Sequence, residues 1–363
     1  MTDYRKAIEP LEPYQPGRPI AAVKKAYGLA EVTKLASNEN PYGASPKASA
    51  AAIEAMRSPE FYPDGYCADL REAAAKFYGI SPDMFVFGAG TDEVISMIAK
   101  VFVNPGDECV TAAVTFGQYA AGVTAMGGVM RYAPMKDDGY DLDAIAALVT
   151  GKTKIVFITN PNNPTGTSHT DADQRAFIAK IPESVMIVVD EAYAEFSDDP
   201  DYPDTLSQIR ERGNIMLLKT FSKAYGLAGL RVGFGIAVPE VIRLFEKIRN
   251  PFNVSVPAQA AAAAALSDRK FIESTYRKNI EARNYMYRAL DDMGISYIPA
   301  TANFIMARTG GDSDALFTAL MKRGYIVRSG AALGMDGYER ISLGTMDQMK
   351  GFVQALKSAL AER

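Results

Sequence analysis

The sequence predicts an α/β protein with two parts: a large domain with a mostly parallel sheet flanked by helices, and a smaller α+β domain. In the first two-thirds of the chain, short continuous apolar runs alternate with longer amphipathic segments. Such runs are typical of strands buried on both faces, and their alternation with helices predicts βαβ units. A chain of 363 residues also exceeds the usual size of one hydrophobic core, which favours a second domain.

The predicted elements of the large domain follow one another in a regular order. Strands are expected at residues 107–114, 154–160, 185–190, 214–220 and 231–237. Helices are expected at residues 91–102, 117–126, 142–149, 171–180 and 240–248. Ligands of such sheets bind at the carboxyl ends of the strands, so the residues that follow these strands are the first candidates for a site.

The pattern of the sequence changes after Pro257. The elements expected there are helices at 258–266 and 269–293, short strands at 295–298, 304–307, 325–328 and 340–344, and a last helix at 346–361. The proline-rich beginning of the chain predicts an arm that packs against this small unit or against a partner. The predicted division is an arm with part of the small domain at 1–40, the large domain at 41–256 and the small domain at 257–363.

The composition argues against several classes of protein. A net charge of -4 and a pI near 5.4 provide no basic surface for nucleic acid. No leader and no apolar stretch long enough to cross a membrane is recognisable, so a soluble cytoplasmic protein is expected. Cys67 and Cys109 do not make a disulfide framework. His169 is the single histidine and follows a turn sequence, so we expect it in an exposed loop or at a helix start, and we expect no metal catalysis.

Lys223 and Asp190 lie at the ends of expected buried strands, where a charged side chain is unfavourable unless it has a partner or a function. The amine of Lys223 could form a Schiff base with pyridoxal phosphate (PLP) and afterwards move protons. The carboxylate of Asp190 follows buried apolar residues and would be costly there without a cationic partner. The protonated pyridine nitrogen of PLP is such a partner, and this pairing keeps the ring an electron sink. Taken alone, each residue could also be an ordinary surface lysine or a structural carboxylate.

Further polar residues supply the remaining contacts of this cofactor. Asn163 and Tyr193 would donate hydrogen bonds to the ring oxygen O3′, although each alone could be a turn asparagine and a core tyrosine. Glycines 88 and 90 precede an expected helix, whose free amides form an anion site. The predicted phosphate site consists of the amides of Thr91 and Asp92 and the side chains of Thr220, Ser222 and Arg231.

The glycine-containing segment does not match a dinucleotide-binding motif. Glu93 stands where that motif has its last glycine, and no acidic residue for a ribose follows at the required place. The sequence therefore favours PLP over a dinucleotide.

These motifs resemble the class I/II group of fold-type I PLP-dependent aminotransferases, and within it the histidinol-phosphate aminotransferase branch. The resemblance extends over residues 13–345. The segments that carry it are 35–43 (LASNENPYG), 62–65 (YPDG), 160–166 (NPNNPTG), 190–193 (DEAY), 222–223 (SK) and 229–233 (GLRVG).

The resemblance implies roles that spacing alone does not. Tyr62 of one subunit would reach the PLP phosphate of its neighbour, which implies a homodimer with shared active sites. Phe116 would stack on the pyridine ring, a position where the branch often has tyrosine. Arg340 would bind the carboxylate of the amino-acid substrate. The residues implied to contact substrate are Tyr14, Asn163, Arg328 and Arg340.

The implied reaction converts L-histidinol phosphate and 2-oxoglutarate to imidazole-acetol phosphate and L-glutamate, a step of histidine biosynthesis. Phe252 occupies a position where some relatives have a tyrosine that helps bind the substrate phosphate. An aromatic amino-acid aminotransferase therefore stays open as an alternative, and so does a threonine-phosphate decarboxylase. A PLP-sensing regulator would need a DNA-binding domain, for which the first 40 residues are too few and too rich in proline.

Overall fold

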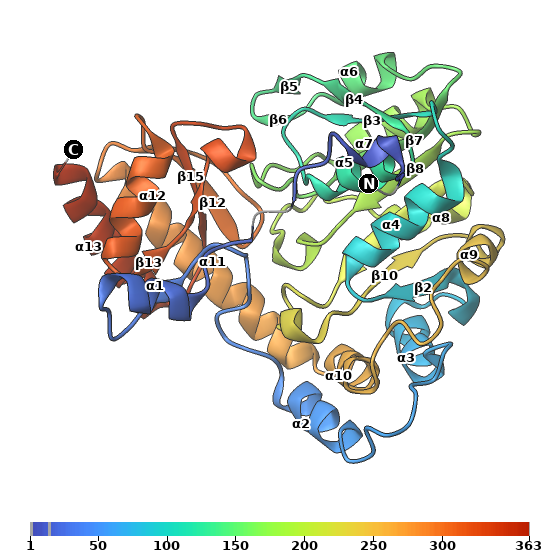
Figure 1. Ribbon diagram of the computed structural model, residues 1–363, viewed down its shortest axis with the longest axis horizontal. Helices are drawn as coiled ribbons and strands as arrows, with labels where there is room; N and C mark the ends of the chain where they lie inside the picture. Colours follow the sequence, from blue (N-terminus) through green and yellow to red (C-terminus); the bar gives the residue numbers. More distant parts are fainter. Residues whose placement is uncertain (1–2, 14–15, 363) are drawn as a thin grey trace.

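A computed structural model describes residues 3–13 and 16–362 of the chain and confirms the predicted fold class. A seven-stranded sheet forms the centre of the larger part (Figure 1), with the strand order β2-β10-β9-β8-β7-β3-β4. Strand β10 is antiparallel to both of its neighbours, and the other pairs are parallel. The strands are β2 (Phe85–Gly88), β3 (Glu108–Ala112), β4 (Val129–Ala133), β7 (Thr153–Thr159), β8 (Met186–Asp190), β9 (Ile215–Thr220) and β10 (Gly233–Ile236).

Helices cover both faces of this sheet, and side chains alternate along each strand between two hydrophobic cores. On β8, Ile187 and Val189 face one core while Met186 and Val188 face the other. The first core packs against α2 (Pro46–Ala55), α3 (Ala68–Tyr78), α6 (Leu142–Ala147), α7 (Asp171–Lys180), α8 (Thr205–Glu211) and α10 (Val256–Leu266). The second packs against α4 (Thr91–Phe102), α5 (Gln118–Ala125) and α9 (Pro239–Glu246). Burial on both faces explains why these strands are continuous apolar runs.

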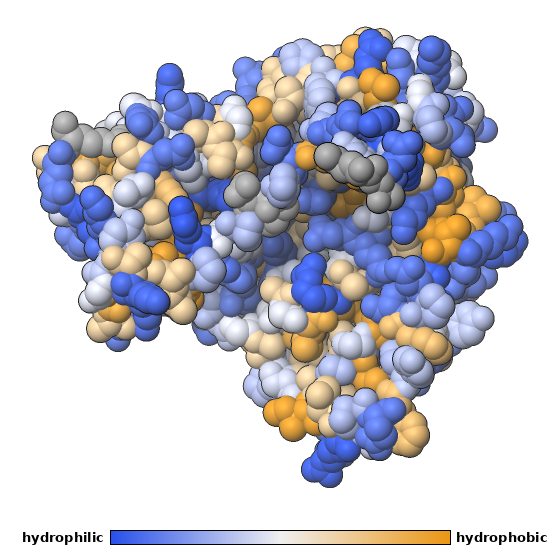
Figure 2. All heavy atoms as spheres, viewed as in Figure 1, coloured by the Kyte–Doolittle hydropathy of each residue, from blue (hydrophilic) through white to orange (hydrophobic). Residues whose placement is uncertain are grey.

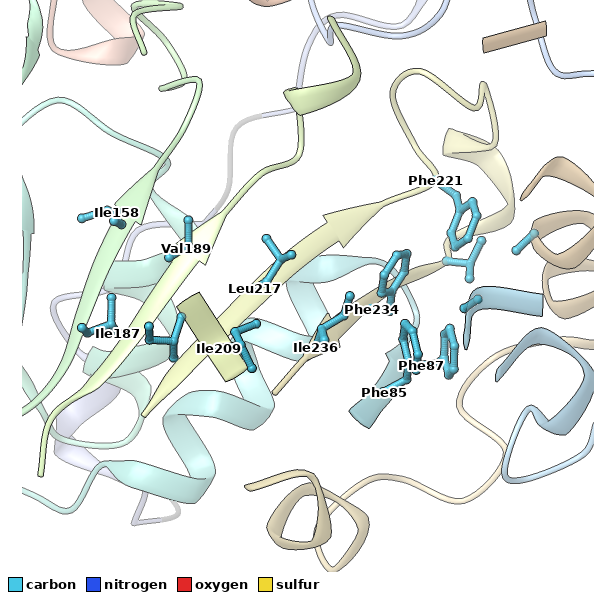
Figure 3. Packing of buried hydrophobic residues seen from close by; sticks show 14 of the residues in the cluster. Phe85, Phe87, Ile158, Ile187, Val189, Ile209, Leu217, Phe221, Phe234 and Ile236 are labelled. Atoms are coloured by element: carbon cyan, nitrogen blue, oxygen red, sulfur yellow. The ribbon is translucent and has the colours of Figure 1, made fainter. Parts of the chain in front are cut away.

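Aromatic side chains concentrate at one end of the first core (Figure 3). Phe85 and Phe87 on β2 lie beside Phe234 on β10, with ring centroids 5.8 to 5.9 Å from Phe234, and Phe221 follows at 5.4 Å. Each fully buried side chain of this size contributes about 1.5–3 kcal/mol to folding. This packing anchors the segment that begins at Phe221 and leads directly to Lys223.

A second, four-stranded antiparallel sheet lies in the other part of the molecule (Figure 1), with the order β11-β12-β15-β14. Its strands are β11 (Ser296–Ile298), β12 (Phe304–Arg308), β14 (Arg328–Ser329) and β15 (Tyr338–Ser342). It packs with α11 (Arg269–Asp291), α12 (Ser313–Lys322) and α13 (Met346–Ala361) around a separate core. The structure also contains a small hairpin of β5 (Met135–Lys136) and β6 (Gly139–Tyr140), and 3-10 turns at Lys6–Ile8, Pro82–Met84, Ala194–Phe196, Ala228–Leu230 and Ala331–Leu333.

The sequence-based prediction missed several elements. It lacked β2, β4, the hairpin of β5 and β6, α2, α3 and α8, and the supposedly irregular arm contains the helix α1 (Ile20–Tyr27) and the strand β1 (Thr33–Lys34). The single strand expected at 325–328 is two strands. β13 (Tyr325–Ile326) pairs with β1, whereas β14 pairs with β15. β2 is only four residues long and β4 is a partly exposed edge strand, so neither presents a long apolar run.

The structure also describes the single histidine and the two cysteines. His169 precedes Thr170, the N-cap of α7, as expected for a helix start, but it is not exposed, and its Nε2 lies 2.8 Å from Gln174 Oε1. Burial lowers the pKa of His169. The two cysteines are free thiols. Within the described ranges, no helix is both long and apolar enough to cross a bilayer.

Candidate active site

Three neighbouring strands of the large sheet end at the same edge. The register pairs Thr159 at the end of β7 with Asp190 at the end of β8, and Asp190 with Leu218 on β9. The segments that follow these strands carry Asn163, Tyr193 and Lys223 respectively. The structure therefore brings the predicted residues together at the carboxyl ends of parallel strands, where α/β proteins bind ligands.

Asp190 is buried and holds two hydrogen bonds. Its Oδ2 accepts a bond from the Tyr119 hydroxyl at 2.6 Å, and its Oδ1 accepts one from the backbone N–H of Ala192 at 3.1 Å. Burial raises the pKa of Asp190 to about 6, against the lowering effect of these two bonds. A carboxylate at this site therefore costs free energy unless a cation offsets it, and a protonated pyridine nitrogen is such a cation.

The role of Tyr119 was not predicted from the sequence. Its hydroxyl also lies 2.8 Å from Thr159 Oγ1, and its ring stacks on Phe157 with centroids 4.6 Å apart. Burial raises its pKa well above the usual value, so at neutral pH it donates its proton to Asp190. Tyr119 also contacts Phe116 edge to face at 5.7 Å, and Phe116 is the predicted stacking residue. The three-residue spacing of these aromatic residues at the start of α5 was the available signal.

Lys223 and Lys219 are close in sequence but have different partners. The Nζ of Lys223 donates to the carbonyl oxygen of Ser37 at 2.9 Å. The Nζ of Lys219 is buried and pairs with Glu195 at 2.8 Å and Glu191 at 3.6 Å. Burial lowers the pKa of Lys219, but these two carboxylates outweigh it, and the net shift is upward. Lys219 is therefore held as an ammonium ion, whereas Lys223 bonds a neutral carbonyl and, among the described residues, forms no ion pair with a carboxylate, which fits the role of the reactive amine.

The two predicted donors to the ring oxygen are oriented by neighbouring side chains. Tyr193 is buried, and its hydroxyl oxygen accepts a bond from Asn38 Nδ2 at 3.1 Å. Asn163 Oδ1 accepts a bond from Arg340 Nη1 at 2.6 Å, which leaves the Asn163 amide N–H groups to donate. Arg340 also donates to the carbonyl oxygen of Ala36 at 2.6 Å. The predicted carboxylate-binding arginine therefore contacts a predicted cofactor residue.

The predicted phosphate site assembles at the amino end of α4. Arg231 lies with Nη1 3.4 Å from Ser222 Oγ and Nη2 3.4 Å from Asp92 Oδ2. Thr220 Oγ1 accepts the backbone N–H of Ser222 at 3.1 Å, and Thr91 is the first residue of α4. Amides at a helix start and an arginine fork together bind phosphate well.

Two glycines keep this cradle open. Gly90 has φ +80°, and a Cβ added there would collide with the guanidinium of Arg231. A Cβ on Gly233 would lie 2.7 Å from the backbone nitrogen of Thr91. Arg231 itself adopts the left-handed region at φ +55°. Such backbone costs persist only where the surroundings enforce them, and here they aim donors at one point.

Glu93 fastens the turn that precedes α4. Its Oε2 accepts the backbone N–H of Ala89 at 2.6 Å and the Nδ2 of Asn253 at 2.8 Å. The sequence interpretation treated Glu93 only as the absence of a glycine. In the structure it connects the phosphate cradle to the segment that contains Phe252.

The remaining predicted residues lie around this centre. Tyr62 is 81% exposed and stacks on Phe252, with centroids 4.7 Å apart. Arg328 on β14 is paired in register with Arg340 on β15, and directly opposed residues of antiparallel strands share one face of the sheet. Tyr14 lies outside the described residues, so its predicted contact with substrate stays a prediction.

The donor set fits PLP. It combines a buried carboxylate for a ring cation, an amine that bonds a backbone carbonyl and, within the described part of the chain, no carboxylate, oriented donors for a ring oxygen and an open anion cradle. Fold and site thus define the class of PLP-dependent enzymes with a large α/β sheet.

The chain belongs to the aminotransferase class I and II family, whose model matches residues 30–356. Relatives named histidinol-phosphate aminotransferase occur in Moorella thermoacetica, 44% identical over 98% of this chain and 93% of that protein, and in Brevibacillus brevis, 45% identical over 95% and 94%. The crystal structure of histidinol-phosphate aminotransferase from Sinorhizobium meliloti in complex with pyridoxal-5′-phosphate superposes with a TM-score of 0.91. It is 28% identical and covers 100% of this chain and 98% of that one. The family predicted from the motifs is confirmed.

Proposed function

We propose that this aminotransferase uses PLP to transfer an amino group between L-histidinol phosphate and 2-oxoglutarate. The proposed substrate rests on the name shared by two relatives that are 44 to 45% identical to this chain over nearly their full length. The observation that carries the chemistry is the buried Asp190 beside Lys223 and the phosphate cradle.

When bound, PLP supplies a carbonyl for the substrate amine and a cationic ring that accepts electron density from the substrate Cα. Asp190 holds the positive charge at the ring nitrogen, and Tyr119 fixes the carboxylate. Asn163 and Tyr193 donate to the ring oxygen. Lys223 would supply the amine that moves the proton between the substrate Cα and the cofactor carbon C4′.

The phosphate of the cofactor is held by the open cradle at α4. The amides of Thr91 and Asp92 and the side chains of Thr220, Ser222 and Arg231 provide its donors. Phe116, which lies just before α5 and contacts Tyr119 edge to face, would cover the ring. The glycines that keep the cradle free of side chains make close approach of a phosphate possible.

The substrate side of the site must accept two differently charged molecules. Glutamate has an α-carboxylate, whereas histidinol phosphate has none and carries a phosphate instead. Arg340 binds the glutamate carboxylate, and Arg328 on the neighbouring strand adds positive charge on the same face of the sheet. Tyr14 is the proposed contact from the arm.

The proposed assembly is a cytoplasmic homodimer in which Tyr62 of each copy reaches the phosphate cradle of the other. It is supported by exposed apolar side chains on α2, on the segment after it that contains Tyr62, and at Phe252, which stacks on Tyr62. Ile53 on α2 and Met56 directly after it, with Phe61 and Phe252, are all at least 45% exposed. Figure 2 shows apolar residues among polar ones at the bottom of the view, where Figure 1 places α2. Exposed apolar patches of this kind mark interaction surfaces.

A steady-state comparison of amino donors tests the substrate. We expect histidinol phosphate to exceed phenylalanine and tyrosine in kcat/KM by at least about tenfold, ~1.4 kcal/mol in transition-state binding. A higher value for phenylalanine would replace this proposal by an aromatic aminotransferase. Release of carbon dioxide from a phosphorylated amino acid, in place of a keto acid, would indicate a decarboxylase.

A further inference from the structure

Tyr193 is connected to a buried hydrogen-bonded pair that reaches from the arm of the chain to the second sheet. The Nδ2 of Asn38 lies 3.1 Å from the Tyr193 hydroxyl oxygen, and both side chains are buried. An amide nitrogen donates and does not accept, so the Tyr193 oxygen is the acceptor of this bond. The hydroxyl proton of Tyr193 therefore points elsewhere.

Ser342 fixes the orientation of the Asn38 amide. Ser342 Oγ accepts the backbone N–H of Asn38 at 2.9 Å, so its own proton is free for Asn38 Oδ1, 2.6 Å away. With Oδ1 facing Ser342, Nδ2 must face Tyr193. The backbone of Asn38 is held as well, because its carbonyl oxygen accepts a bond from Asn303 Nδ2 at 2.9 Å.

The hydrogen bonds of this network all point the same way: Ser342 donates to Asn38, and Asn38 donates to Tyr193. No described residue is within hydrogen-bond distance of Tyr193 Oη as an acceptor of its proton. Among the described residues, two cationic groups lie near Tyr193. The Nζ of Lys223 is 5.6 Å from the centroid of the Tyr193 ring. Arg340 lies over the ring of Phe304, and Phe304 in turn packs against Tyr193. Asp190 is close along the chain. The tests below change none of these three.

We propose that Asn38 and Ser342 are positioning residues that direct the hydroxyl proton of Tyr193 at the ring oxygen of PLP and so set the acidity of the bound cofactor. This inference rests on the proposed function. Ser342 lies two residues after Arg340 on β15, so both side chains lie on one face of the strand. The strand proposed to bind the substrate carboxylate thereby also sets the direction of a cofactor contact.

The test is a spectrophotometric pH titration of the PLP-loaded protein. Asn38→Asp keeps the shape of the side chain and tolerates the φ of +55° at this position, but its carboxylate accepts bonds from both Ser342 and Tyr193. Tyr193 then donates to this new carboxylate instead of to the ring oxygen. Because the ring oxygen loses a hydrogen-bond donor, the midpoint pH of the absorbance titration should rise by about one unit. Ser342→Ala frees the amide to rotate and should give a smaller shift in the same direction.

Two controls separate the direction of the proton from other effects. Ser329→Ala removes a buried serine of the neighbouring strand β14, which bonds Asp314 at 2.6 Å, and should titrate like the wild type. In a Tyr193→Phe background, Asn38→Asp should add no further shift. A shift that persists there comes from the new charge alone and overturns the proposal. Circular dichroism and Tm confirm that the variants fold.

The outcomes distinguish this inference from the proposed function. The wild type should bind PLP, and its absorbance should change with pH. If Asn38→Asp and Ser342→Ala then titrate with the same midpoint pH as the wild type, the positioning role is wrong and the proposed function stands. If the wild type retains no PLP after gel filtration at any pH, both are wrong.

Discussion

The two ends of the proposed cofactor site are built in different ways. At the ring end, Asp190, Tyr119 and Tyr193 are buried and connected by hydrogen bonds to other buried groups. At the phosphate end, the side chains of Arg231 and Asp92 are 49% and 52% exposed, and their ion pair at 3.4 Å is worth only about 0–1 kcal/mol. At the ring end, burial determines the protonation states of the side chains. At the phosphate end, the backbone conformation and solvent exposure determine how an anion is held.

This difference explains which residues can be replaced at low cost. A charge at the ring end has no solvent to screen it, so its partners set its protonation state. At the phosphate end, several amides and side chains share one anion, and the loss of any one is partly compensated by water. Changes at the ring end should therefore have larger effects than changes at the phosphate end.

The largest expected effect is that of Lys223→Ala at the centre of the site. The amine is required to move the proton in the reaction, so we expect turnover to fall below detection while PLP still binds through the phosphate cradle. Steady-state rates and equilibrium dialysis with PLP measure the two effects. Borohydride reduction of the wild type followed by peptide mapping identifies the modified lysine, and a pyridoxyl group on Lys219 would contradict the assignment.

The second expected effect tests the buried ring end by its dependence on pH. Folding raises the pKa of Asp190 from 3.8 to about 6, so the folded protein without PLP binds a proton that the unfolded chain has released. The stabilisation is complete below pH 3.8 and is lost as the pH rises to about 6. Relative to Asp190→Asn, the PLP-free wild type should lose about 3 kcal/mol of unfolding free energy over this window.

Urea unfolding of both PLP-free proteins at several pH values measures this difference. All other titrating groups are shared by the two proteins and cancel in the comparison. Added PLP should restore stability to the wild type above pH 6 more than to the variant. Parallel pH curves for the two proteins would show that Asp190 is not desolvated, and the contrast between the two ends would then disappear.

The same contrast governs what could be predicted from the sequence. Strands β7, β8 and β9 were predicted to within a residue or two at each end because continuous apolar runs mark strands buried on both faces. Asp190 and Lys223 were then found as charged residues at the ends of such runs. The phosphate cradle could be predicted because glycines before a helix start predict an anion site from the local sequence alone.

The missed residues depend on contacts between distant segments. Tyr119 looks like one more apolar residue of a helix, and only the packing of α5 on the sheet brings it to Asp190. Asn38 and Ser342 are separated by 304 residues in the sequence. No periodicity or spacing identifies such a pair, since it depends on how the arm lies between the two sheets.

The smallest expected effect concerns the exposed phosphate end, where Tyr62 of a second copy is proposed to contribute. Tyr62→Phe keeps the ring that stacks on Phe252 and removes only the hydroxyl. The loss of one exposed hydrogen bond, ~1 kcal/mol, should weaken PLP binding about fivefold. Adding excess Lys223→Ala protomers should restore the affinity measured per intact Lys223 site, because each such site in a mixed dimer receives an intact Tyr62. Protomers that carry both substitutions are the matched control and should restore nothing. Equal restoration by both preparations, once subunit exchange is demonstrated, would show that Tyr62 acts within its own subunit.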